Sequence, residues 1–285
     1  MRVLGIIGGS GLYEMDGLEE VEEKRVDTPF GPASDAIVSG RLGDTRMLFL
    51  PRHGRGHRFP PHRVPYRANV LALKMLGAEQ IVSISAVGSM RENIHPGDIV
   101  LVDQFLDRTR SRPNTFFDDD GVVAHVEFAD PVDAALSAAL HRAAEKVGAR
   151  AHRGGTYVCI EGPQFSSRAE SNLFRSWDVS VIGMTNLPEA RLAREAELPY
   201  ATVALVTDYD CWHQTEASVS VESVIAILRK NVLTAQAILR EVVKDLPDPA
   251  DSPATRALAQ AILTAPDHIS AEAREKLRPL IGKYF

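Results

Sequence analysis

The sequence predicts an α/β fold in which helices cover a β-sheet. Short apolar runs alternate along the chain with stretches of helical periodicity, which is the pattern of strands connected by covering helices. Nearly every run ends in a glycine, a hydroxyl or a charged residue. The 285 residues are 45% hydrophobic, enough to fill one sizeable core, and no internal repeat or low-complexity tract divides them.

The apolar runs are expected to form the strands, because each is short and stops at a turn residue. The first run, Val3–Ile7, is rich in branched side chains and breaks at Gly8-Gly9. The expected strands, in chain order, are Val3–Ile7, Ala36–Leu42, Thr45–Leu50, Gln80–Ser85, Ile99–Val102, Thr156–Ile160, Val179–Gly183 and Tyr200–Thr207.

Helices are expected where apolar residues recur every three or four positions. The clearest follows Asp130-Pro131, which would supply an N-cap and a first-turn proline, and it ends at Gly148. A longer helix is expected after Ser220, with Val221 and Val224 on one apolar face. The other expected helices are Tyr66–Leu76, Arg168–Trp177 and Pro188–Glu197.

One domain is expected over residues 1–245, followed by a helical tail over residues 246–285 that packs on it. Asp245 to Pro253 contain three prolines and three aspartates, a composition typical of a linker. The roughly 30 residues after this linker cannot bury a core of their own, so the tail is not expected to be a separate domain.

Charge and cysteine content exclude several classes of protein. The formal net charge is -6 at pH 7, which argues against a nucleic-acid or anionic-membrane partner. Cys159 and Cys211 are too few for a disulfide scaffold or a four-thiolate metal site, which favours a reducing cytoplasm. No run approaches 18 apolar residues, and the N-terminal run resembles neither a signal peptide nor a membrane span.

Glycine and polar residues follow the expected strands, where ligands bind in open α/β sheets. The turn Gly8-Gly9-Ser10-Gly11 follows the first strand but lacks the G-x-G-x-x-G spacing of a dinucleotide site. Two interpretations stay open: a plain tight turn, or a cradle for a single phosphate made of backbone N–H groups and the Ser10 hydroxyl.

A basic cluster in this acidic chain indicates an anion site. Arg52 is the stronger candidate for phosphate contact because a guanidinium matches two phosphate oxygens, although surface ion pairing would also explain an Arg-His pair. His53 and His57 are poor metal ligands, because Gly54 and Gly56 disfavour the helix that their spacing requires. The cluster comprises Arg52, His53, Arg55, His57, Arg58, His62 and Arg63.

Carboxylates group at two places in the chain. Asp208 and Asp210 are two apart at a strand end, so in an extended chain they point to the same side. Such a pair raises one pKa, and a protonated carboxyl can act as a general acid, but a strand-end cap or turn is equally compatible. The run Asp118–Asp120 is expected to be a solvated connection rather than a metal site.

Taken together, seven strings are similar to the methylthioadenosine phosphorylase branch of the trimeric purine nucleoside phosphorylase family. The resemblance covers about residues 3 to 243 and implies a single α/β domain with a mixed, partly closed sheet. It also implies a homotrimer with sites at subunit boundaries. The strings are GIIGGSGL, VDTPFG, PRHGRGH, GSMRENIHPGDIVLVDQFLDRT, IEGPQFSSRAES, IGMTNLPEA and TDYDCW.

The resemblance also implies roles for individual residues. The phosphate site would consist of Ser10, Arg52, His53, Ser85, the Ala86 backbone and Thr185. The nucleoside site would consist of Met184 at the ribose, Phe165 and Ser166 at the base, Val221 and Val224 at the methylthio group, and His125 lent by the neighbouring subunit. The purine-reading and catalytic carboxylates would be Asp208 and Asp210.

The implied reaction is phosphorolysis of 5′-methylthioadenosine to adenine and 5-methylthioribose 1-phosphate, with phosphate as co-substrate and neither a metal nor an organic cofactor. An anion beneath the anomeric carbon would stabilise the oxocarbenium charge and also attack it. Asp208 would protonate the imidazole-ring nitrogen of the purine, supported by Asp210. A carboxylate accepts from the amino group of adenine but faces the carbonyl oxygen of an oxopurine unpaired.

The sequence departs from the family at three positions, and three alternative functions stay open. Ser10 and Ser85 stand where animal homologues have threonine, and Gly183 where they have asparagine. The nearest alternative is a methylthioinosine or broader purine nucleoside phosphorylase. A histidine phosphatase is remote, because the Arg52-His53-Gly54 string has no second His-Gly late in the chain. The third alternative is a non-catalytic nucleoside-binding module.

Overall fold

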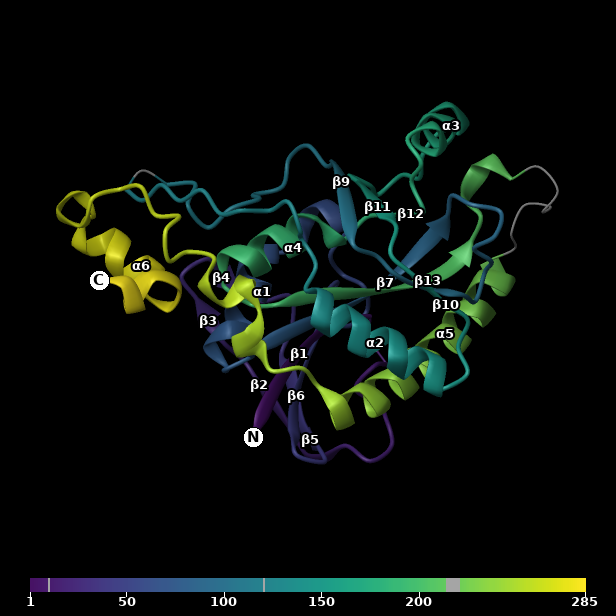
Figure 1. The fold of residues 1–285 in the computed structure, drawn as a ribbon, viewed down its shortest axis with the longest axis horizontal. Helices are drawn as coiled ribbons and strands as arrows, with labels where there is room; N and C mark the ends of the chain where they lie inside the picture. Colours follow the sequence, from purple (N-terminus) through teal and green to yellow (C-terminus); the bar gives the residue numbers. More distant parts are fainter. Residues whose placement is uncertain (10, 120, 214–220) are drawn as a thin grey trace.

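The computed structural model describes residues 1–9, 11–119, 121–213 and 221–285, with the backbone alone for residues 221–226 and 228. Within these residues a mixed sheet of 11 strands forms the centre of the molecule, and helices cover both of its faces (Figure 1). This is the α/β class with a mixed sheet that the sequence predicts. A separate pair of two-residue strands lies beside the sheet.

All eight predicted strands are present, with bounds that differ by a few residues. The predicted strand Gln80–Ser85 continues to Ser89. The sequence analysis missed five strands. One of them is Glu19–Lys24, whose glutamates suit an exposed sheet edge rather than a core. The strands are β1 (Arg2–Gly8), β2 (Glu19–Lys24), β3 (Asp27–Thr28), β4 (Gly31–Pro32), β5 (Ile37–Leu42), β6 (Thr45–Pro51), β7 (Gln80–Ser89), β8 (Ile99–Leu101), β9 (Gln104–Arg108), β10 (Ala151–Arg153), β11 (Thr156–Ile160), β12 (Val181–Gly183) and β13 (Tyr200–Asp208).

β7 is the strand around which the sheet is organised. β13 pairs with one edge of β7 in parallel along most of its length. The other edge pairs first with β1, in parallel, and then with β12, which is antiparallel. β6 lies beyond β1, and β12 leads on to β11 and β9. The C-terminal ends of β1, β6 and β13 therefore come together beside β7.

The helices form two layers and one outlying element. Residues of α1, α4 and α6 share a core with one face of the sheet, and residues of α2 and α5 share another core with the opposite face. α3 stands apart from both layers at the top of Figure 1. The helices are α1 (Tyr66–Met75), α2 (Ala134–Lys146), α3 (Arg168–Ser176), α4 (Asn186–Glu195), α5 (Val221–Val242) and α6 (Ala271–Ile281), with 3-10 turns η1 (Pro61–Arg63), η2 (Asp210–Trp212), η3 (Val243–Asp245), η4 (Pro249–Asp251), η5 (Pro253–Arg256), η6 (Pro266–His268) and η7 (Gly282–Tyr284).

The start of α2 corrects the sequence analysis. The helix begins at Ala134, and the carboxylate of Asp133 caps it by accepting from the Leu136 N–H at 2.8 Å. The prediction that Asp130-Pro131 begins this helix is wrong, since Asp133 offers the same capping chemistry three residues later. The predicted end at Gly148 is confirmed, because this glycine has φ +75° directly after the C-cap.

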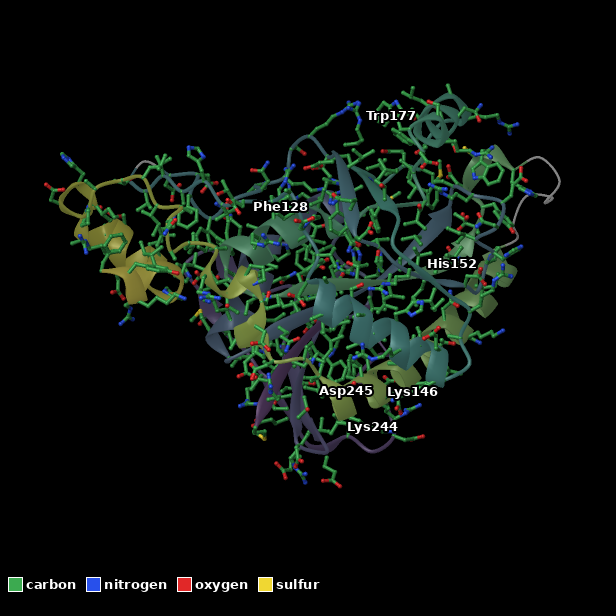
Figure 2. All side chains as sticks on the ribbon, viewed as in Figure 1. Phe128, Lys146, His152, Trp177, Lys244 and Asp245 are labelled. Atoms are coloured by element: carbon green, nitrogen blue, oxygen red, sulfur yellow. The ribbon has the colours of Figure 1, made fainter. Side chains whose placement is uncertain are left out.

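The C-terminal tail packs against the same core as α1. Leu258, Leu277 and Leu280 are buried in one cluster with Leu71. Where the tail begins, α2 and α5 are joined by ion pairs from Lys146 to Glu241 (3.2 Å) and from Arg142 to Asp245 (3.2 Å). Figure 2 shows Lys146, Lys244 and Asp245 gathered at this corner. In the part of the chain that the structure describes, no helix is both long and apolar enough to cross a bilayer.

Candidate active site

The middle of β7 opens to solvent between two described neighbouring strands. β1 pairs with β7 as far as Ser83 and β12 pairs with it from Gly88, which leaves Ile84 to Val87 without a described strand on that edge. Ala86 is exposed although it lies at the centre of the sheet. The Ile84 carbonyl points into the opening, and since backbone groups alternate between the edges of a strand, the Ala86 N–H points there too. We call this opening the β7 gap.

Arg52 forms a wall of the β7 gap and is held there by protein groups. It follows β6, is 2% exposed, and contacts Glu189 of α4 twice, with Nε–Oε2 at 2.7 Å and Nη2–Oε1 at 2.9 Å. It also donates to the carbonyls of Ile84 (3.0 Å) and Ile7 (3.2 Å) and to Ser83 Oγ (2.7 Å).

The Arg52 guanidinium remains a cation despite its burial. Burial alone would lower the pKa of Arg52, but the adjacent Glu189 carboxylate raises it above its ordinary value. Within the described residues, one of the two Nη1 hydrogens has no acceptor. Arg52 can therefore still donate one hydrogen bond to an anion in the β7 gap.

Two hydroxyl groups meet beside the β7 gap. Ser85 Oγ lies 3.0 Å from Thr185 Oγ1, although β7 carries one residue and the segment before α4 carries the other. Both side chains are buried, at 3% and 7% exposure. Gly8 and Gly9 follow β1 beside them, and Ser10 lies outside the described residues, so its predicted contact stays a prediction.

His53 lies close to Arg52 in a neutral form. Its Nδ1 is 2.8 Å from the Phe59 carbonyl, and burial lowers the pKa of His53 to about 4. With Nδ1 donating to this carbonyl, Nε2 is the acceptor nitrogen. Its ring stacks on that of His57, with 4.3 Å between centroids.

The rest of the basic cluster does not converge on the β7 gap. Arg55 pairs with Glu23 at 2.6 Å, and Arg58 pairs with Asp35 at 3.4 Å, both at the surface. Arg55 and Arg58 therefore form ion pairs, as the alternative interpretation of the basic cluster predicts.

The aspartate pair lies at the end of β13, beside the last residues of β7. Asp208 Oδ1 accepts from the Asp210 N–H at 2.8 Å, and its Oδ2 accepts from Thr207 Oγ1 at 2.7 Å. Asp210 has φ +53°, so the pair meets through a turn and not through the extended chain that the sequence analysis assumed. A Cβ on Gly88 would lie 3.0 Å from Asp208 Oδ1, so this glycine makes room for the carboxylate.

Asp210 is the member of the pair whose protonated form the structure favours. Its burial raises the pKa of Asp210 and the charge of Asp208 adds to the rise, while a hydrogen bond from Ser171 opposes it. Ser171 Oγ donates to Asp210 Oδ2 at 2.5 Å from the buried face of α3. α3 thus orients the carboxyl group of Asp210.

The loop between β11 and α3 carries the predicted base residues and brings Ser166 next to the aspartate pair. Cys211 Sγ, beside Asp210, donates to the Ser166 carbonyl at 3.4 Å. Ser166 Oγ is buried with no hydrogen-bond partner among the described residues. Met184 packs over Gly162, whose added Cβ would lie 2.6 Å from the methionine sulfur. Phe165 is 85% exposed in the single chain.

Arg112 organises these segments, and the sequence analysis missed it. Its side chain is 6% exposed and donates to the carbonyls of Met184 (2.7 Å), Leu187 (2.7 Å) and Glu161 (2.6 Å). These carbonyls end β11 and begin α4, so one buried cation holds both walls of the site. Nothing local in the sequence distinguishes it from a charged loop residue; Glu189 and Ser171 were missed for the same reason.

Three predicted substrate contacts, Val221, Val224 and His125, are not among the residues that the described structure brings to this site. Val221 and Val224 fall in the first turns of α5, and their side chains are outside the described residues. His125 is exposed, and its backbone N–H donates to the Ala261 carbonyl at 2.9 Å in the C-terminal tail. That tail lies at the opposite side of Figure 1 from the end of β13.

Two residues of the acidic run Asp118–Asp120, which lies between β9 and α2, form ion pairs. Arg67 contacts Asp118 at 2.6 Å, and Lys276 of α6 contacts Asp119; Asp120 lies outside the described residues. Among the residues that the structure describes, no three His, Cys, Asp or Glu side chains gather as metal ligands would.

Comparison with known proteins assigns the chain to a family. The model of the phosphorylase superfamily matches residues 3–244 of this chain. The chain belongs to the phosphorylase superfamily. The matched residues include every part of the β7 gap and the aspartate pair, and they stop at the start of the C-terminal tail.

Relatives within the phosphorylase superfamily match over nearly the whole chain. The S-methyl-5′-thioadenosine phosphorylase of Geobacter sulfurreducens is 57% identical over 284 residues, covering 99% of each chain. That of Thermosynechococcus vestitus is 55% identical over 286 residues, again covering 99% of each.

Two solved structures of superfamily members are also similar. A methylthioadenosine phosphorylase from an Antarctic soil metagenomic library superposes with a TM-score of 0.93 at 48% identity, covering 98% of both chains. The methylthioadenosine phosphorylase of Schistosoma mansoni, solved with adenine, gives a TM-score of 0.80 at 40% identity, covering 85% of this chain and 91% of that one.

Proposed function

We propose that this protein is a pentosyltransferase that cleaves 5′-methylthioadenosine with inorganic phosphate, producing adenine and 5-methylthioribose 1-phosphate. Relatives named S-methyl-5′-thioadenosine phosphorylase at up to 57% identity over the full chain support this activity. The observation that carries the proposal is the layout of β7. Ser85 lies in the open middle of β7, and Gly88 lies beside the aspartates. The two residues are three positions apart, about 10 Å along a strand. That span fits a ribose between an anion and a purine.

The β7 gap is the proposed phosphate site. Arg52 contributes a buried cation, Ser85 and Thr185 contribute hydroxyls, and the Ala86 backbone contributes an N–H. Such preorganised donors hold the phosphate beneath the sugar, where its charge stabilises the oxocarbenium ion as the base departs. The same phosphate then forms the new bond to the anomeric carbon. Ser10 and His53 complete this site in the proposal.

The aspartate pair is the proposed base site. In the proposal Asp208 protonates the imidazole-ring nitrogen of adenine, and Asp210, which Ser171 holds in place, supports it. The remaining carboxylate charge accepts from the exocyclic amine. Phe165 would stack on the base, the unpartnered Ser166 hydroxyl would bond to it, and Met184 would support the ribose.

The direct test is adenine release from 5′-methylthioadenosine with and without phosphate. We expect release that rises with phosphate concentration, and preference for methylthioadenosine over methylthioinosine, because an oxopurine places a carbonyl oxygen against a carboxylate. Preference for the inosine compound would contradict the assigned base choice. Tight nucleoside binding without adenine release at any phosphate concentration would contradict phosphorolysis itself. An isolable phosphohistidine at His53 would favour a histidine phosphatase instead.

We also propose a cytoplasmic homotrimer in which each subunit completes its neighbour's site, and in which the tail after residue 245 belongs to the catalytic domain. His125 lies on a segment bound to the C-terminal tail, away from its own aspartates, and Phe165 is 85% exposed. Both facts suit residues that meet a second copy of the chain. The reaction needs no metal or organic cofactor, so treatment with a chelator should leave the rate unchanged.

Shared sites predict complementation between two defective variants. His125→Ala should raise the KM for methylthioadenosine and Asp208→Asn should abolish turnover of it. In mixed trimers formed at random, about a quarter of the sites combine an intact Asp208 with an intact His125 from the next subunit. Subunits refolded together should therefore recover a fraction of sites with wild-type KM. Activity equal to the average of the two separate variants would contradict a shared site.

A further inference from the structure

Tyr157 of β11 and Gly183 of β12 lie on neighbouring strands, and the Tyr157 ring occupies the space beside Gly183. Tyr157 is completely buried, with its ring edge-on to Phe105 at 5.9 Å between centroids. A Cβ built on Gly183 would lie 2.0 Å from the Tyr157 hydroxyl oxygen and 2.5 Å from Cζ. Position 183 therefore has no side chain because the phenol fills the volume that one would need.

The phenol hydroxyl reaches the two hydroxyl residues of the β7 gap. Tyr157 Oη lies 3.2 Å from Ser85 Oγ and accepts from the Thr185 N–H at 3.4 Å. Ser85 Oγ lies in turn 3.0 Å from Thr185 Oγ1. Three hydroxyl groups, each with a single hydrogen, thus form one connected group beside the proposed phosphate.

The direction of these hydrogen bonds decides what an anion can use. If Ser85 and Thr185 had only each other, one of their two hydrogens would be consumed between them. A hydrogen donated by Tyr157 to Ser85 Oγ fixes the direction of the group: Ser85 then donates to Thr185 Oγ1, and the Thr185 hydrogen is left to point into the β7 gap. Such preorganisation favours a ligand that only accepts hydrogen bonds.

We propose that Tyr157 is a positioning residue for phosphate: through the space that Gly183 leaves open it orients Ser85, and through Ser85 it directs the Thr185 hydrogen toward the anion. This role rests on the proposed phosphorolysis. Burial raises the pKa of Tyr157 to about 12, so the phenol stays neutral and keeps its hydrogen across the working pH range. A phenolate at this place would repel the phosphate.

The test is Tyr157→Phe, which keeps the ring and removes the hydroxyl alone. We expect the KM for phosphate to rise about tenfold, as loss of one oriented hydrogen bond implies, while the KM for methylthioadenosine changes less than twofold. Tyr284→Phe is the matched control. It removes a phenol hydroxyl in the C-terminal tail, which donates to Glu197. It should leave both KM values unchanged.

A second variant tests whether Tyr157 acts through Ser85. In a Ser85→Ala background, Tyr157→Phe should raise the phosphate KM less than twofold, because the hydroxyl that it orients is gone. An unchanged phosphate KM in Tyr157→Phe, an equal rise of both KM values, or full additivity with Ser85→Ala would each overturn the proposal. If the wild-type protein released no adenine with phosphate, the proposed function would fail by itself. Calorimetric titration of inorganic phosphate into wild type and Tyr157→Phe would then still test the positioning role.

Discussion

At the scale of single residues, His53 shows how burial sets chemistry beside an anion site. Its pKa falls to about 4 because burial disfavours the charged ring, although the Phe59 carbonyl opposes the shift. A neutral ring with Nδ1–H donated to Phe59 leaves Nε2 as an acceptor. His53 would therefore bind a protonated phosphate oxygen, or become charged only when phosphate arrives.

The lowered pKa of His53 predicts a loss of stability in acid. Between pH 6.5 and about 4 the unfolded chain binds a proton that the folded ring does not, so folding weakens as the pH falls through this window. One such group contributes at most about 1.4 kcal/mol per pH unit. His53→Asn, which keeps a donor for the Phe59 carbonyl, should lessen the pH dependence of the urea midpoint measured from pH 7 to 4. An unchanged slope in the variant would mean that other groups control it.

At the scale of elements, α3 is a short helix with a complete N-terminal cap, and it lies next to the proposed base site. Ser167 Oγ accepts from the Glu170 N–H at 3.3 Å, and Glu170 Oε2 accepts from the Ser167 N–H at 2.8 Å. This capping box begins a helix of nine residues whose buried Ser171 orients Asp210. The cap therefore connects local sequence to the position of the carboxyl group that is proposed to support catalysis.

Removal of that cap should weaken nucleoside binding. Ser167→Ala is expected to cost about 0.5–2 kcal/mol of helix stability and to raise the KM for methylthioadenosine, because Ser166 and Ser171 flank the loosened turn. Ser270→Ala is the matched control: Ser270 caps α6 by accepting from the Ala273 N–H at 3.1 Å, in the tail. Steady-state kinetics of both variants give the comparison, and an equal effect on KM would contradict a local role for α3.

At the scale of the whole molecule, the Arg52–Glu189 pair joins elements that are far apart in the chain. The two residues are 137 positions apart, and the pair links the ends of β1 and β6 to β7 and α4. Both side chains are almost fully buried, at 3% and 1% exposure. Because a buried charge without its partner is costly, the assembled fold depends on both.

Glu189→Gln should therefore destabilise the protein by about 3–5 kcal/mol, because it leaves the Arg52 cation buried without its counter-charge. Glu23→Gln, which breaks the surface pair with Arg55, should cost no more than about 1 kcal/mol. Urea midpoints at fixed protein concentration measure both changes. Added phosphate should restore part of the loss in Glu189→Gln if Arg52 faces the anion. Equal losses in the two variants would contradict the structural importance of the pair.

Sequence periodicity and composition were sufficient for much of the architecture. Apolar runs bounded by turn residues predicted eight strands, because local side-chain pattern and backbone preference act within a few residues. They failed at β2, where exposure at the sheet edge permits glutamates, and at the start of α2, where two aspartates compete for one capping role. The roles that motif resemblance gives to the site residues stay predictions.

Only the tertiary structure decided how those residues work together. The β7 gap arises because β1 stops and β12 begins on the same edge of β7, a consequence of pairing between segments that are far apart in the chain. Burial then determines the chemistry. Arg52 pairs with Glu189, and Arg112 donates hydrogen bonds to carbonyls of separate segments. The Tyr157 hydroxyl lies in the space where Gly183 has no side chain. Such contacts depend on which surfaces exclude water and meet in space, and no local stretch of sequence contains that information.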